Sequence, residues 1–124
     1  VVWVGFVSEE EKFALIQHAR ILVLASHQES LSLVVLEAMK LGVPVIVNAN
    51  CDVLKGHIDR SNAGLYFYQK ADFLETMQLL LSDRALNRTM GENGKKYMKD
   101  YYEWADIDQK MIDIIEKVAE NGKQ

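Results

Sequence analysis

Short, uninterrupted apolar runs alternate along the chain with longer segments in which apolar residues recur every three or four positions. The runs are rich in β-branched residues and are bounded by polar or turn residues, as expected of strands buried on both faces of a sheet. The longer segments have the spacing of amphipathic helices. Four strands are predicted, at residues 1–7, 21–26, 44–48 and 64–68.

Helices are predicted between these strands and after the last of them. Ser8 and Glu11 form a capping-box pattern at the start of the first helix, which runs to about residue 20. Gly42 and Pro44 end the second helix, at 33–41. The remaining predicted helices cover residues 53–60, 71–81, 87–101 and 105–120. This alternation predicts an α/β fold, a Rossmann-like parallel sheet with helices on both faces and right-handed crossovers.

Composition limits the classes of partner and the cellular location. Of the 124 residues, 49% are hydrophobic, which is enough for one domain with a single core. The net charge of -4, without a basic block, argues against nucleic acid or an anionic membrane surface as a partner. Cys51 is the only cysteine, so no internal disulfide can form and a cytoplasmic location is expected. No apolar run approaches the roughly 20 residues that cross a bilayer, which leaves peripheral contact with a membrane open.

Candidate chemistry concentrates in residues 26–48. Ligands of open parallel sheets bind beyond the carboxyl ends of the strands. Ser30 or Ser32 can cap the helix that begins near Leu33, and the free N–H groups of its first turn suit a diphosphate. Glu37 would lie roughly 7 Å further along the helix axis. A carboxylate there could accept hydrogen bonds from both hydroxyls of a ribose.

Glu29 would lie on the opposite side of the expected phosphate, where the hydroxyls of an attached sugar need an acceptor. Two glutamates eight residues apart also occur by chance, and a helical glutamate is usually only solvated. For Glu37 the solvated role is less favoured, because its neighbours in the helix are nearly all apolar.

A resemblance to the donor-site segment of retaining GT-B glycosyltransferases of family 4 is carried by SHQESLSLVVLEAMKLGVPVIV. The matching features are a strand ending in Ser26, then Glu29, a gap of seven residues, Glu37-Ala38-Met39, Gly42 and Pro44-Val45. The similarity continues from VWVGFVS through HARILVLAS to SNAGLYF, MGENGKKY and Trp104. It implies that residues 1–124 are the second half of the C-terminal, nucleotide-sugar-binding domain, a fragment that lacks the N-terminal acceptor domain. The start at Val1, inside an apolar run and without a lead-in, agrees with a fragment.

The resemblance implies a nucleotide-diphosphate sugar as substrate, transfer to an unknown acceptor with retention of configuration, and no cofactor. Glu29 would be catalytic, contacting the donor sugar and stabilising charge at the reacting carbon. Glu37 would bind the ribose, and backbone groups around Leu31 to Val34 would meet the diphosphate. The implied donor-binding residues are Glu37, Ser30, Leu31, Ser32, Leu33, Val34 and His27.

Two departures from the family pattern keep other functions open. Leu31-Ser32 stands where the family commonly has Phe-Gly, and Cys51-Asp52 stands where it has a glycine pair. One alternative is therefore a catalytically inactive GT-B-like interaction domain, and another is a sugar-nucleotide epimerase or phosphorylase of the same fold.

The family's Arg and Lys that neutralise the diphosphate come from segments upstream of this chain. The isolated chain is therefore expected to bind nucleotide sugar weakly and to be inactive. Its first strand would also lack its usual neighbour, which invites self-association.

Other candidate motifs are given structural roles. Asp106-Ile107-Asp108 matches a D-x-D metal pattern, but it falls near the start of a predicted helix rather than after a strand. The histidines lack metal-ligand spacing, so no metal is predicted. Cys51 has no base placed near it by the sequence, so it is not expected to be a nucleophile.

Overall fold

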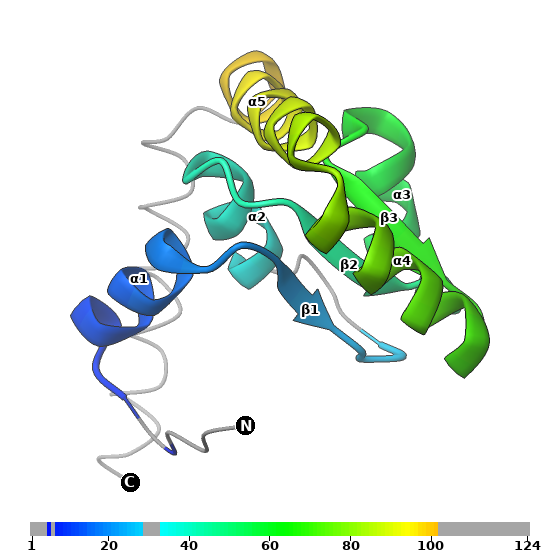
Figure 1. The fold of residues 1–124 in the computed structure, drawn as a ribbon. Coiled ribbons are helices and arrows are strands. Elements are labelled where there is room, and N and C mark those ends of the chain that lie inside the picture. Colours follow the sequence, from blue (N-terminus) through cyan, green and yellow to red (C-terminus); the bar gives the residue numbers. More distant parts are fainter. Residues whose placement is uncertain (1–4, 6, 29–32, 102–124) are drawn as a thin grey trace, which may run out of the picture.

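The computed structural model describes residues 5, 7–28 and 33–101, which form a three-stranded parallel sheet with five helices (Figure 1). The strands lie in the order β1-β2-β3, so strands that follow one another along the chain are neighbours. In chain order the elements are α1 (Glu9–His18), β1 (Leu22–Leu24), α2 (Leu33–Lys40), β2 (Val45–Asn48), α3 (Asp52–Ser61), β3 (Gly64–Phe67), α4 (Lys70–Ser82) and α5 (Arg84–Tyr101). The predicted α/β, Rossmann-like class is confirmed.

Most predicted boundaries agree with the structure to within one or two residues, and α5 is the clearest exception. It begins at Arg84, whereas the sequence predicted a start at residue 87. Asp83 explains the earlier start, because its side chain accepts a hydrogen bond of 2.9 Å from the backbone N–H of Leu86 and so caps the helix. The predicted strand at 1–7 and helix at 105–120 lie outside the described residues, apart from Gly5 and Val7, which belong to no strand.

The two faces of the sheet bury different residues of β2. Val45 and Val47 join the main core with side chains from α2 and α3, whereas Ile46 points to the opposite face, as alternation along a strand requires. On that face Phe67 packs edge-on against Phe73 of α4, with ring centroids 5.2 Å apart. In Figure 1, α4 lies in front of the sheet while α2 and α3 lie behind it, which confirms helices on both faces.

β1 differs from the expectation of a strand buried on both faces. Leu22 and Leu24 pack against the core, but Val23 between them is 39% exposed. The reason is that β1 lies at the edge of the described sheet, and α4 covers the Val23 face mainly over β2 and β3. All four residues of the central strand β2 are buried, as predicted.

The end of α2 is set by a glycine turn and by close contact with α5. Gly42 has a φ of 76°, and its N–H donates to the carbonyl of Met39 while the N–H of Val43 donates to that of Ala38. This is the Schellman pattern, and it ends the helix where the sequence predicted. A Cβ at Gly91 of α5 would collide with the carbonyl oxygen of Gly42. The two helices can therefore pack this closely only with glycine at position 91.

None of the helices within the described ranges is long and apolar enough to span a membrane.

Replacement of Gly91 by alanine is expected to destabilise the fold by about 2 kcal/mol. Overpacking by one methyl group usually costs up to about 3 kcal/mol, and the upper value applies here because the methyl group would meet backbone. The higher helix propensity of alanine offsets about 1 kcal/mol of this loss in stability. Denaturant unfolding of the purified variant measures the difference.

The matched control is Gly56→Ala in α3, where the new methyl group would meet the guanidinium at the far end of the flexible Arg60 side chain rather than backbone. This variant should be as stable as the parent or slightly more stable. Equal effects of the two substitutions would contradict the close-packing argument.

Candidate functional site

The loops that follow β1 and β2 meet at the carboxyl ends of these strands, where one buried side chain joins them. The side-chain oxygen of Asn48 accepts hydrogen bonds from the backbone N–H and the side-chain amide of Asn50, at 2.9 and 3.0 Å. The backbone donor fixes which end of the Asn48 amide is oxygen. Its Nδ2 therefore donates to the carbonyl of Ala25 at 3.1 Å and contacts Nδ1 of His27 at 3.2 Å.

His27 is thus placed at the expected edge of the sheet, on the exposed side of the loop. Because Nδ2 of Asn48 is a donor, Nδ1 of His27 must accept, which puts the ring proton on Nε2. The sequence predicted that His27 contacts the nucleotide-sugar donor. The structure places His27 after β1, and contact with such a donor stays a prediction.

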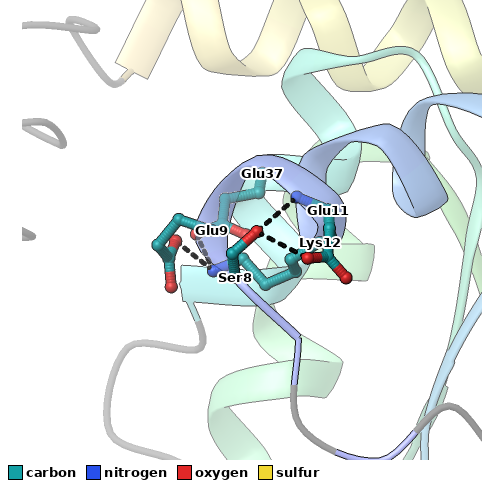
Figure 2. Close-up of polar contacts among 5 residues, drawn as sticks. All are labelled: Ser8, Glu9, Glu11, Lys12 and Glu37. Atoms are coloured by element: carbon teal, nitrogen blue, oxygen red, sulfur yellow. Dashed lines mark hydrogen bonds and ion pairs between the residues drawn. The ribbon is translucent and has the colours of Figure 1, made fainter.

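Glu37 lies in the middle of α2 with only 1% of its surface exposed. Its Oε1 is 3.3 Å from the ammonium nitrogen of Lys12 in α1, and the same nitrogen is 2.8 Å from Oε2 of Glu9 (Figure 2). The other oxygen of Glu37, Oε2, is buried and has no hydrogen-bond partner in the described part of the chain. Glu37 therefore holds one satisfied and one unsatisfied acceptor.

The position of Lys12 follows from the way α1 begins. Ser8 accepts a hydrogen bond of 3.1 Å from the N–H of Glu11, and its hydroxyl donates to the carboxylate of Glu11 at 3.2 Å (Figure 2). This confirms the predicted cap at Ser8. With the first turn fixed, Glu9 and Lys12, three residues apart, share the helix face that meets α2.

The electrostatics of Glu37 oppose its ionisation. Burial raises the pKa of the Glu37 carboxyl above its usual value, and the charge and hydrogen bond of Lys12 only partly offset this. The negative charge of Glu9 adds to the rise. Burial would lower the pKa of Lys12, but its contacts with Glu9 and Glu37 outweigh burial and raise that pKa.

The remaining predicted residues divide into two groups. Leu33 and Val34 form the first turn of α2 and pack partly against the core. Glu29, Ser30, Leu31 and Ser32 lie outside the described residues, as do Asp106 and Asp108, so their predicted roles stay predictions. Cys51 is buried and precedes α3 without a side-chain capping bond. Within 7–28 and 33–101, no group of three His, Cys, Asp or Glu residues is arranged to hold a metal ion.

Sequence reasoning missed two residues of this site. Lys12 is 25 positions from Glu37, and no local pattern connects them. Asn48 was predicted only as part of a strand end, although a polar residue closing an apolar strand at a ligand-binding edge is itself a signal.

Curated relatives are similar to this chain in sequence over most of its length. "Glycosyltransferase 1 domain-containing protein 1" of Xenopus tropicalis is 30% identical over 94 residues, 73% of this chain and 26% of the relative. An uncharacterized glycosyltransferase of Methanocaldococcus jannaschii is 27% identical over 119 residues, 92% of this chain and 30% of the relative. The chain therefore spans about a quarter to a third of the length of these relatives.

Two solved structures are similar in fold. A sucrose-phosphate synthase from Thermosynechococcus elongatus superposes with a TM-score of 0.75 and 29% identity, over 98% of this chain and 31% of that one. WaaG, a glycosyltransferase involved in lipopolysaccharide biosynthesis, gives a TM-score of 0.62 and 28% identity over 82% and 28% of the two chains. A family profile described as "Glycosyl transferases group 1" matches residues 1–97. The chain accordingly belongs to the group 1 glycosyltransferases, and its fold is that of their GT-B members.

Proposed function

We propose that this chain forms part of the donor site of a glycosyltransferase that moves a sugar from a nucleoside-diphosphate sugar to an acceptor with retention of configuration. The observation that carries the proposal is Glu37, a buried carboxylate with one oxygen left without a hydrogen bond by the described residues. A buried unsatisfied acceptor is costly, so an acceptor of this kind supports a role for Glu37 in binding a ligand that donates to it.

The hydroxyls of a ribose are hydrogen-bond donors of the kind that Oε2 of Glu37 lacks. Two adjacent hydroxyls can both donate to a carboxylate, and hydrogen bonds to a charged acceptor are stronger than neutral ones. One of these donors would satisfy Oε2 of Glu37. Glu37 lies in the same short helix as Leu33 and Val34, whose backbone groups are assigned here to the diphosphate. Ribose and diphosphate of one nucleotide can therefore be bound by one helix.

Glu29, which lies between β1 and α2 in the sequence, is proposed to contact the donor sugar and to stabilise positive charge at the reacting carbon. His27, two residues earlier in the chain, contacts Asn48 at the end of β2. Membership of the glycosyltransferase family and the position of Glu29 in the chain shortly after β1 support the assignment.

Removal of either glutamate should disable the protein encoded by the complete gene in a distinct way. Glu37→Ala should weaken the binding of a nucleoside diphosphate by about tenfold to a hundredfold, the equivalent of one charge-assisted hydrogen bond. Glu29→Ala should chiefly reduce the rate of sugar transfer, by about a hundredfold or more. Calorimetric binding and product analysis by NMR, which also reports the anomeric configuration, measure both effects.

Glu92→Ala is the matched control, because Glu92 is also a helical glutamate near a lysine, with Lys95 3.7 Å away, but it is exposed. It should behave like the parent. If the parent binds no nucleoside diphosphate and transfers no sugar, the chain belongs to an inactive interaction domain instead.

Glu37→Gln should stabilise the fold without ligand at neutral pH while weakening nucleotide binding. The folded-state pKa of Glu37 lies above the unfolded value, so its contribution to stability is lost as pH rises through the folded pKa. Glutamine does not ionise and avoids this loss. The gain in melting temperature should be larger at about pH 7 than at about pH 3, where the glutamate is almost fully protonated in both states. A gain independent of pH would contradict the argument.

A polypeptide of residues 1–124 alone should bind nucleoside diphosphate weakly and transfer no sugar. By the family resemblance, the Arg and Lys that neutralise the diphosphate come from segments upstream of residues 1–124, and charge-assisted contacts account for much of such binding. Titration of this polypeptide beside the protein from the complete gene measures the difference. Equal affinity and measurable transfer by the short polypeptide would refute the expectation.

A further inference from the structure

The ion pair between α1 and α2 gives a residue of α1 a role at the same site, if Glu37 binds ribose as proposed above. Lys12 is the only described cation within salt-bridge distance of Glu37. Its ammonium contacts Oε1 and leaves Oε2 as the buried atom without a partner. The two oxygens of one carboxylate are thus distinguished by their surroundings.

Lys12 is stabilised by two carboxylates, of which Glu9 is the nearer. Its shorter contact, 2.8 Å, is with Glu9 on its own helix, and its side chain is 30% exposed to water. Glu37, by contrast, is 1% exposed, and Lys12 is the ion-pair partner of its side chain among the described residues. The ion pair therefore matters more to the buried carboxylate than to the partly exposed lysine, which has Glu9 as a second partner.

The charge of Lys12 decides how Glu37 can bond a ligand. A carboxylate accepts hydrogen bonds at both oxygens, whereas a protonated carboxyl carries an O–H donor and accepts less well. Burial favours the protonated form, Glu9 favours it as well, and Lys12 opposes both. α5 packs on another side of α2, where its Lys95 lies against Gly42 at the helix end.

We propose that Lys12 is a positioning residue of the nucleotide site: its ammonium bonds Oε1 of Glu37, fixes the carboxylate in place and so leaves Oε2 to accept a ribose hydroxyl. Lys12 acts through Glu37 and does not itself contact the ligand. The role of Glu9 is to hold the ammonium over α2, with the first turn of α1 fixed by the Ser8 cap.

The test is a pH series of binding measurements on the protein encoded by the complete gene, with UDP, GDP and ADP as probes. Lys12→Met keeps the length of the side chain and removes its charge. The substitution should lower the affinity for the best-bound nucleoside diphosphate by about tenfold near neutral pH. This is the size of effect expected when one hydrogen bond to a charged carboxylate is lost. The pH below which binding is lost should also move upward, because Glu37 then stays protonated to higher pH. Lys12→Arg should restore binding and the parental pH profile.

Lys55→Met is the matched control. Lys55 is 33% exposed and pairs at 2.9 Å with Asp59 of its own helix, so it resembles Lys12 in exposure but contacts no buried carboxylate. This variant should bind each probe like the parent at every pH. Thermal unfolding of the Lys12 variants, measured in parallel, shows that they are folded.

The double variant with Glu37→Gln separates a role through Glu37 from a general effect on the fold. Lys12→Met should add no further loss when glutamine occupies position 37, because no charge remains to be held. An equal loss in both backgrounds would overturn the inference. If Lys12→Met binds like the parent while Glu37→Ala binds more weakly, the role of Lys12 is refuted but the proposed function stands. If the parent binds none of the probes, the proposed function is refuted as well.

Discussion

A carboxylate inside an apolar helix is the constraint to which the surroundings of α2 conform. Glu37 cannot be solvated where it lies, so a cation has to approach from a neighbouring helix, and α1 supplies it through Lys12. On another side, α5 comes so close that only glycine fits at position 91. The helix is thus held by charge on one side and by backbone packing on another. The buried carboxylate is thus kept in place by contacts within the protein itself.

The parts of this arrangement that were predictable from sequence are those encoded locally. The end of α2 follows from Gly42 and Pro44, and the burial of Glu37 follows from its apolar neighbours. The cap at Ser8 could be read from a pattern spanning four residues. In each case the determining residues lie within one or two helical turns of one another, so periodicity and turn chemistry were sufficient.

What could not be predicted depends on contacts between distant parts of the chain. Lys12 meets Glu37 only because α1 folds against α2. β1 has the composition of a fully buried strand, yet the exposure of Val23 depends on what lies beside the strand, which its own residues do not specify. Asp83 belongs to both ends of a helix junction, because it ends α4 and its side chain caps α5. A prediction that treats the two helices separately therefore places the start of α5 too late.

Asn48 has a consequence for how the segments that follow β1 and β2 respond to change. Its single amide holds the loop after β1 through Ala25 and the loop after β2 through Asn50. The two loops therefore share one mechanical linkage, and a displacement of either one reaches the other through a few bonds. Movement at His27 would be transmitted to the chain entering α3, so these two loops are expected to vary together, as one unit, when such sites diverge.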